Sequence, residues 1–590
     1  MTDTLETVVP TGPPAYPAGV AWSAAISEAP LTEALDRSVA LYGSNACVEF
    51  LGRKYSYEEI GGLVERAAKG FQGLGVRKGV RVGLLLPNSP YAVICYYAVL
   101  KAGGTVVNFN PLYVAEEIEH QIQDSGTRIM VTMDLRLTLP KVSTSLGRTS
   151  LERVVVCSMA EALPFAKSSL FRFLGRGRIA ELPEDGLHVT FADLTDNDGG
   201  FKPVAISPQE DVAVLQYTGG TTGVPMGAML THANIAANAR QVAMWDPDIQ
   251  EGEARIIGVL PLFHVFAMTV VMNMGILIGA ELVLLPRFEI AMVMKALRRR
   301  QPTQFPGVPS LFHALLEYPK LSPEDLQSLE FCLSGGAPLP SEIRNEFEAL
   351  TGCRLVEGYG LTETSPVVTC NPLKSAIRQD AARVGVGKDG SVGLALPGTQ
   401  IEIRALEARE TALAVGEPGE VCIAGPQIMA GYWDNPEATA KTLKNGWVHT
   451  GDVGYLDEDG FLFLIDRIKD LIICSGYNVY PRVVEEAIYR HPAVAEVTVV
   501  GVPDEDKGEV PKAYVRLKPD QALSAEELLA FLEDKLSRIE RPRHVEFRDE
   551  LPKTMIGKLS KKELVAEEQA RRAATGQADG QPDGQAETEA

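Results

Sequence analysis

A loop rich in glycine and threonine is the segment of this sequence with the clearest potential for chemistry. It follows an apolar run at 212–215 and reads Tyr217-Thr218-Gly219-Gly220-Thr221-Thr222-Gly223-Val224-Pro225-Met226-Gly227. A strand that opens into such a loop offers backbone N–H groups and hydroxyls in a small concavity, as a polyphosphate site requires. The loop is not a Walker A motif, because no Lys-Ser or Lys-Thr pair follows its glycines. Taken alone, the segment could also be a plain surface loop.

Two later segments combine glycine with hydroxyl, aromatic and carboxylate side chains. They are Ser334-Gly335-Gly336-Ala337-Pro338-Leu339 and Glu357-Gly358-Tyr359-Gly360-Leu361-Thr362-Glu363-Thr364. Glycines without a Cβ atom allow a flat ring to approach the backbone closely. A carboxylate such as Glu363 can share a hard cation with phosphate oxygens. A turn and a helix cap are the ordinary alternatives for these two segments.

Three further segments supply charged or titratable groups. They are Pro261-Leu262-Phe263-His264-Val265-Phe266, Trp447-Val448-His449-Thr450-Gly451-Asp452 and Leu551-Pro552-Lys553-Thr554-Met555-Ile556-Gly557-Lys558. His264 alone could equally be a satisfied core histidine. Asp452 has two oxygens that can accept two hydroxyl groups. Lys558 alone would be read as a surface residue, because a lone lysine near a C-terminus usually lies at the surface.

Short apolar segments alternate with helical periodicity through most of the chain. Residues 81–86 are typical of a buried strand, 91–101 of an apolar helix, and 105–108 of the next strand. The same rhythm recurs near residues 331 and 355. This order predicts a mostly parallel α/β core, with the loops described above following its strands.

The pattern changes near residue 466. A charged pentad at 466–470 separates an apolar run at 461–465 from another at 471–473, and the chain from 571 onward has little to bury. We therefore predict an α/β protein with an N-terminal extension, a large multi-sheet domain, a small mobile α/β domain and a disordered tail. The predicted bounds of these four parts are 1–29, 30–466, 467–566 and 567–590.

Composition excludes some classes of function. The 590 residues include 56 Lys and Arg against 77 Asp and Glu, a formal net charge of −21, which argues against nucleic acid as a partner. The eight cysteines are scattered without a CxxC pair, so we expect reduced, mostly buried thiols rather than metal ligands. Because no leader peptide is evident and no apolar run reaches the ~18 residues that span a bilayer, we expect a cytoplasmic protein.

The joint occurrence and order of these segments resemble the adenylate-forming enzymes, the superfamily of acyl-CoA synthetases, luciferases and adenylation domains. The resemblance runs from about residue 30 to 564. It implies that ATP and Mg²⁺ convert a carboxylate into an acyl-adenylate with release of pyrophosphate, and that a thiol then displaces AMP. For this chain the expected thiol is CoA.

The resemblance assigns a role to each segment. It places His264 near the substrate carboxylate, Thr362 at the α-phosphate, Glu363 on Mg²⁺ and Lys558 as the catalytic lysine of adenylation. The residues it assigns to ATP and AMP are Thr218, Gly219, Gly220, Thr221, Thr222, Gly223, Gly335, Gly336, Ala337, Glu357, Gly358, Tyr359, Gly360, Asp452 and Arg467. Lys469 occupies the hinge position, and the residues of the thiol channel are Ser475, Gly476 and Tyr477.

One position departs from the family pattern. The phosphate loop of the family usually carries lysine where this chain has Met226. The replacement removes a cation near the β- and γ-phosphates but leaves the backbone donors and the hydroxyls. We expect an active enzyme with weaker handling of ATP or pyrophosphate; a non-catalytic relative is the alternative.

The substrate acid is the least defined feature. The phosphate loop and the segment 474–481 most resemble bacterial long-chain fatty-acid–CoA ligases, so a fatty acid is the expected substrate. A medium-chain or aryl acyl-CoA ligase, a fatty acyl-AMP ligase and a weak fatty-acid-binding relative remain alternatives. The oligomeric state is open, with a homodimer as one alternative.

A separate segment, 163–178, is basic and apolar in an acidic chain. It contains Lys167, Arg172, Arg176 and Arg178 and no acidic residue, with Leu and Phe between the cations. One interpretation of this pattern is reversible contact with an anionic membrane surface, which would place the protein peripherally on the inner face of the plasma membrane. A short helix packed on the large domain is the equal alternative.

Overall fold

The computed structural model describes residues 13, 15–17, 19–27, 29–218, 225–373, 387–407, 410–475, 477–504, 506–553 and 559–578. The chain forms two compact units: residues 1–450 with 455–463, and residues 451–454 with 464–590. The boundary between the units falls in the hairpin of β21 (Trp447–Leu456) and β22 (Leu462–Arg467).

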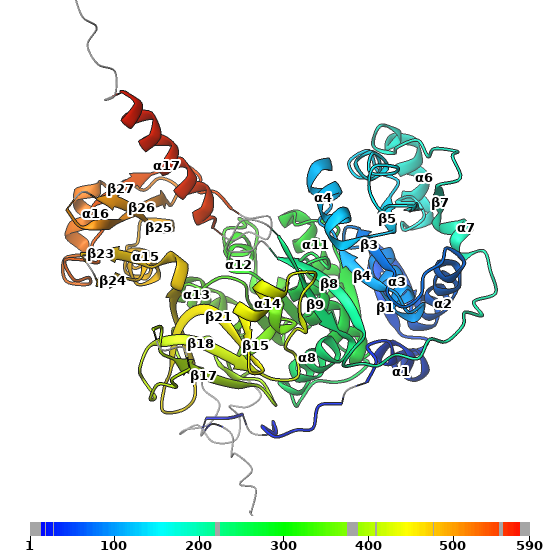
Figure 1. Ribbon diagram of the computed structural model, residues 1–590, viewed down its shortest axis with the longest axis horizontal. Coiled ribbons are helices and arrows are strands. Elements are labelled where there is room, and N and C mark those ends of the chain that lie inside the picture. The colour runs from blue at the N-terminus through cyan, green and yellow to red at the C-terminus, as the bar shows by residue number, and fades with distance from the viewer. Residues whose placement is uncertain are drawn as a thin grey trace, which may run out of the picture. The chain divides into compact units, whose positions relative to one another are not determined.

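Two large sheets form the framework of the first unit (Figure 1). The nine-stranded sheet has the order β16 (Leu394–Ala395), β15 (Val367–Cys370), β14 (Leu355–Gly360), β13 (Phe331–Ser334), β12 (Gln304–Gly307), β10 (Arg255–Gly258), β11 (Glu281–Leu284), β1 (Ala46–Phe50) and β2 (Arg53–Ser56). The eight-stranded sheet has the order β19 (Gly431–Tyr432), β9 (Met226–Thr231), β8 (Val212–Thr218), β4 (Thr105–Asn108), β3 (Arg81–Leu85), β5 (Ile129–Met133), β6 (Arg153–Cys157) and β7 (His188–Thr190). A third sheet contains β17 (Gln400–Arg404), β18 (Gly419–Ala424), β21 and β20 (Leu443–Lys444), with β22 paired to β21.

The predicted mostly parallel α/β core is confirmed. The pairs β3–β4, β4–β8, β12–β13 and β13–β14 are all parallel. The strands predicted at 81–86 and 105–108 are β3 and β4, and the helix predicted at 91–101 is α3 (Pro90–Lys101). These segments were readable because strands buried on both faces are almost continuously apolar.

A layer of helices lies between the two large sheets. Helix α3 contacts β3 and β4 on one side and β1 on the other, and it is buried from Pro90 to Leu100. A helix that is apolar on all sides must be enclosed in this way. The same layer contains α2 (Tyr57–Gly73), α8 (His232–Met244), α9 (Val265–Ala267), a π-helical turn at Met268–Asn273 and α10 (Met274–Leu277).

Other helices cover the first unit. They are α1 (Glu33–Tyr42), α4 (Ala115–Ser125), α5 (Leu139–Ser143), α6 (Phe165–Leu174), α7 (Phe191–Thr195), α11 (Ile290–Arg300), α12 (Pro309–Leu316), α13 (Ser341–Thr351) and α14 (Pro436–Thr442). All eight cysteines are buried with free thiols, as expected. Among the described residues, no helix combines the length and the apolar character needed to cross a membrane.

The second unit has its own core. Strands β24 (Tyr477–Val479), β23 (Ile472–Cys474), β26 (Gly508–Leu517) and β25 (Val494–Asp504) form one sheet, with β27 (His544–Phe547) paired to β26. Helices α15 (Pro481–Tyr489) and α16 (Ala525–Phe531) belong to the same unit. A separate cluster of buried apolar side chains fills it.

The start of the predicted disordered tail is corrected by the structure. Helix α17 runs from Lys561 to Ala578, past the expected boundary at 566/567. Glu568 accepts hydrogen bonds from Lys512 at 2.8 Å and from the Tyr514 hydroxyl at 2.6 Å. The composition of this segment did not reveal the full length of the helix, because its charged residues form ion pairs and hydrogen bonds with residues of the sheet. Residues 579–590 lie outside the described residues.

Candidate active site

The carboxyl ends of three neighbouring parallel strands form the base of the candidate site. Gly307 of β12 is in register with Ser334 of β13, which is in register with Glu357 of β14. The Gly335 N–H donates to the Gly307 carbonyl at 3.1 Å. Because parallel strands end at one edge of the sheet, the loop after β13 and the segment after β14 are adjacent, as ligand sites of open α/β sheets require.

Steric limits explain the glycines at this edge. A Cβ atom on Gly360 would lie 1.9 Å from the Pro366 carbonyl oxygen, and one on Gly335 would lie 3.0 Å from the Phe266 ring. Gly336 has a φ of +81°, a left-handed conformation that favours glycine. A Cβ atom at position 360 would therefore force a backbone shift, and one at position 335 would crowd the Phe266 ring.

Glu357 fixes the loop after β13 to β14. Its side chain is buried, and one carboxylate oxygen accepts from the Leu339 N–H at 3.2 Å. Tyr359, two residues later, is half-buried and in register with Thr369 of β15. The structure thus places Gly335, Gly336, Ala337 and the 357–360 segment at a single edge of the sheet.

Glu363 is connected to the strand that leaves the phosphate loop. It lies with Thr362 in a short 3₁₀ turn, Thr362–Thr364, and accepts a hydrogen bond from the Tyr432 hydroxyl at 2.7 Å. Tyr432 belongs to β19, which pairs with β9 at Ala228. Burial raises the pKa of Tyr432, and the neighbouring Glu363 charge raises it further, so the phenol remains a donor at neutral pH.

The two ends of the phosphate loop are held together. Thr218 at the end of β8 pairs with Met226 at the start of β9. The predicted ligands Gly219, Gly220, Thr221, Thr222 and Gly223 lie between them, outside the described residues. The Met226 side chain is half-buried and packs against the core cluster.

His264 lies at the start of α9. Its Nδ1 accepts from the Phe266 N–H at 3.3 Å, so the proton of a neutral ring is assigned to Nε2. Gln216 of β8 donates to the Phe263 carbonyl at 2.9 Å, which ties this segment to the strand before the phosphate loop. Together with the Phe266–Gly335 contact, these bonds place His264 beside the edge of β13.

The remaining described candidates belong to the second unit. Asp452 is buried and forms an ion pair with Arg467, whose Nε lies 3.1 Å from Oδ1. Lys469 is exposed in the 3₁₀ turn Ile468–Asp470. Ser475 and Tyr477 are exposed at the β23–β24 hairpin, where Ser475 has a φ of +52°.

Two predicted residues of the second unit cannot be placed. Gly476 lies between Ser475 and Tyr477 but outside the described residues. Lys558 also lies outside the described residues. The described residues on either side of it, Lys553 and Leu559, form a β-bridge. The roles of all these residues, in both units, stay predictions.

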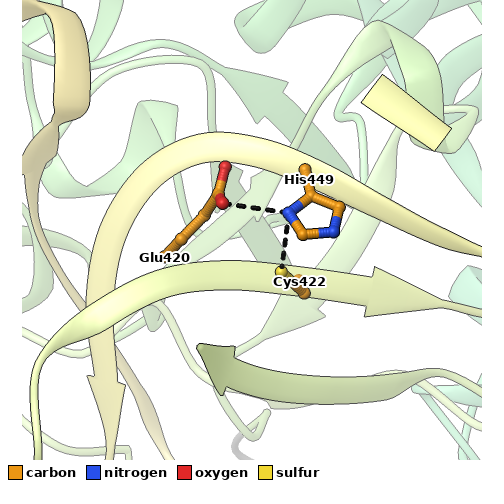
Figure 2. Close-up of side chains that lie close together, drawn as sticks. All are labelled: Glu420, Cys422 and His449. Carbon is orange, nitrogen blue, oxygen red and sulfur yellow. Dashed lines mark hydrogen bonds and ion pairs between the residues drawn. The ribbon is translucent and has the colours of Figure 1, made fainter. Parts of the chain in front are cut away.

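Sequence reasoning missed a buried polar network next to Asp452 in the chain. Figure 2 shows Glu420 and Cys422 of β18 facing His449 of β21. The His449 Nδ1 atom lies 2.9 Å from a Glu420 carboxylate oxygen and 3.5 Å from the Cys422 sulfur. The ligand atoms of the three residues lie within 4.8 Å of one another, and the Nδ1 atom makes its hydrogen bonds within this cluster. We assign the network to holding β21 against β18, three residues before Asp452.

Glu420→Gln should test this assignment. We expect the first unit to lose about 1 kcal/mol of stability, because the buried carboxylate oxygen that lies 2.9 Å from Nδ1 is replaced by an amide, which is the weaker acceptor. Calorimetry would show a lower Tm for the larger transition, with Glu458→Gln, an exposed site in the turn between β21 and β22, as the control. An unchanged Tm would show that the carboxylate of Glu420 is not needed for stability.

Comparison with known proteins defines the class. Residues 35–433 match the family described as AMP-binding enzyme, and residues 483–558 match the AMP-binding enzyme C-terminal domain. The chain therefore belongs to the AMP-binding enzyme family.

Relatives and solved structures agree with this assignment. A long-chain-fatty-acid–CoA ligase of Bacillus subtilis (strain 168) is 41 % identical over 565 residues, 94 % of this chain and 97 % of that protein. A feruloyl-CoA synthase of Amycolatopsis sp is 34 % identical over 513 residues, 87 % of this chain and 94 % of that protein. Among solved structures, the anthranilate CoA ligase AuaEII in complex with anthranoyl-AMP has a TM-score of 0.80 at 26 % identity, covering 92 % of this chain and 98 % of that chain.

Proposed function

We propose that this protein is a long-chain fatty acid–CoA ligase. It would form fatty acyl-CoA from a fatty acid, ATP and CoA, through an acyl-adenylate, with release of pyrophosphate and AMP. The observation that carries the proposal is the 41 % identity to a long-chain-fatty-acid–CoA ligase over almost the whole of both chains. A second such ligase, from Escherichia coli O157:H7, is 37 % identical over 546 residues.

The first half-reaction joins two anions. A fatty acid carboxylate oxygen attacks the α-phosphorus of ATP, and the bond to pyrophosphate breaks. We propose that Lys558 and Thr362 offset the charge at the α-phosphate and that His264 orients the carboxylate. The glycine edge at 335–336 and 358–360 would hold adenine against Tyr359, while Asp452 would accept the ribose hydroxyls.

The carboxylate of Glu363 suits a magnesium ion. It is an oxygen donor of the kind Mg²⁺ prefers, and the hydrogen bond from Tyr432 fixes its orientation. An MenE enzyme of Bacillus subtilis, 27 % identical to this chain, has been solved in complex with ATP and magnesium ion. When bound, the ion would neutralise phosphate charge.

The second half-reaction transfers the acyl group. The CoA sulfur, after losing its proton, attacks the acyl carbon, and the bond to AMP breaks. We propose that Ser475, Gly476 and Tyr477 line the approach of the thiol and that the small domain swings about Lys469 between the two steps.

An aryl acyl-CoA ligase is the second candidate, because a feruloyl-CoA synthase is 34 % identical to this chain. Pyrophosphate release should therefore be measured with Mg²⁺-ATP and a series of aliphatic and aromatic acids, with and without CoA. Turnover that peaks with long aliphatic acids and requires CoA would support the proposal. A maximum with aromatic acids would replace it, and accumulation of acyl-AMP despite CoA would indicate an acyl-AMP ligase.

Met226→Lys should strengthen ATP binding. We expect the KM for ATP to fall about tenfold, because a cation near the phosphates would contribute about 1–2 kcal/mol. Any side chain at position 226 starts from a site that is half-buried against the core, so the substitution itself could disturb the packing. Met226→Gln, which has similar length and no charge, is therefore the matched control. An equal KM for both variants would show that the charge at this position is irrelevant.

A further inference from the structure

Helix α6, Phe165–Leu174, presents apolar side chains to solvent. Phe165, Leu170, Phe173 and Leu174 are 89, 57, 71 and 70 % exposed, and no residue of the helix is buried. Leu170 and Phe173 share a face at a helical spacing of three residues, and Phe165 and Leu174 border it on either side. An apolar face of this kind is normally covered.

The opposite side of the segment attaches it to the domain. Pro164, Ser168, Phe171 and Gly175 are its less exposed positions, at spacings of four, three and four residues. Phe171 packs against the core cluster, and Lys167 donates to the Leu51 carbonyl in the turn between β1 and β2. The helix is therefore held on the domain with its apolar face exposed to solvent.

Cations surround this apolar face. Lys167, Arg172, Arg176 and Arg178 are all exposed, and residues 163–178 contain four cations and no acid in a chain of net charge −21. Arg172 lies 3.7 Å from Glu161. The next acid along the chain is Glu181. A locally basic, apolar surface on an acidic protein can approach an anionic layer that repels the rest of the molecule.

We propose that α6, with the 3₁₀ turn Arg176–Arg178, is an interfacial helix that docks on an anionic lipid bilayer. Its Phe and Leu side chains would enter the headgroup–acyl boundary while the arginines contact lipid phosphates. A second copy of this chain fits less well, because pairing α6 with itself would bring eight like charges (four plus four) together. The functional benefit of docking rests on the proposed function: a long-chain fatty acid is concentrated in membranes, so docking would bring the enzyme to its substrate.

Flotation of the full chain with vesicles tests the docking without measuring catalysis. We expect binding to vesicles of phosphatidylcholine with phosphatidylglycerol and weaker binding to phosphatidylcholine alone. The variant Phe165→Ser/Leu170→Ser/Phe173→Ser should lower the partition constant at least about tenfold. Full burial of even one such side chain in the bilayer would account for a change of about that size. Arg172→Gln/Arg176→Gln/Arg178→Gln should lower it about fivefold per cation and weaken its salt dependence.

Two controls make the result specific. Leu41→Ser removes a leucine that is 59 % exposed on α1 and should leave binding unchanged. Turnover of a water-soluble, shorter acid should be the same in the α6 variants and the wild type.

Vesicle binding without turnover of any acid would contradict the proposed function and keep the docking inference. Equal flotation of wild type and α6 variants, or dimerisation through α6 seen by light scattering, would overturn the docking inference.

Discussion

Lys558→Ala should lower the rate of acyl-adenylate formation about 10³-fold. The physical reason is that a carboxylate must approach a polyphosphate, and removal of a single group that stabilises transition-state charge typically costs about 10²–10³-fold in rate. The loss should appear in kcat more than in the KM for ATP, because the cation acts on charge that develops during attack. ATP–pyrophosphate exchange measures this step alone.

A matched control separates this effect from a general loss of positive charge. Lys562→Ala removes an exposed lysine at the start of α17 and should leave exchange unchanged. Lys558→Ala should also keep most of its ability to transfer a supplied acyl-adenylate to CoA, since the nucleophile in that step attacks the acyl carbon and not the α-phosphorus. Loss of both half-reactions, or an equal loss in the control, would contradict the assigned role.

Glu363→Gln should reduce adenylation about 10²-fold and raise the Mg²⁺ concentration needed for half-maximal rate. Glutamine preserves the size of the side chain but removes the charge that would hold the cation. Titration of the exchange rate with Mg²⁺ at fixed ATP gives both quantities. A lower rate with an unchanged Mg²⁺ dependence would show that Glu363 acts on something other than the metal.

Tyr432→Phe is the matched control for this prediction. It retains the ring in β19 and removes the hydroxyl that donates to Glu363 at 2.7 Å. We expect at most about a tenfold decrease in rate, because a single hydrogen bond to a charged group that remains in place is lost. An effect as large as that of Glu363→Gln would mean that orientation of the carboxylate matters more than its charge.

Much of the fold could be predicted from the sequence. The strands β3, β4 and β13 and the helix α3 were readable from apolar runs, because elements enclosed on both sides tolerate few polar residues. The extent of α17 was not readable. Its Glu567, Glu568 and Arg571 have the composition of a tail, and their ion pairs with the sheet of the second unit become visible only in the folded chain.

The candidate site divides in the same way. The glycines at 335 and 360 could be singled out because they lie next to strand ends, and the structure supplies the steric reason for them. The Tyr432–Glu363 bond joins residues 69 positions apart, and the Glu420–His449 bond joins residues 29 apart. The signal that could have drawn attention to His449 was its place three residues before Asp452.

The sequence by itself determined the family, the α/β class and the residues with the potential for chemistry, because these are carried by residue types at fixed local spacings. The tertiary structure alone decided which of these residues become neighbours and which surfaces stay exposed. The apolar face of α6 is the clearest case. Its sequence was equally compatible with packing on the domain, and only the folded chain shows Phe171 turned inward while Phe165 and Phe173 face solvent. Burial depends on what the rest of the chain places opposite a side chain, which no local pattern contains.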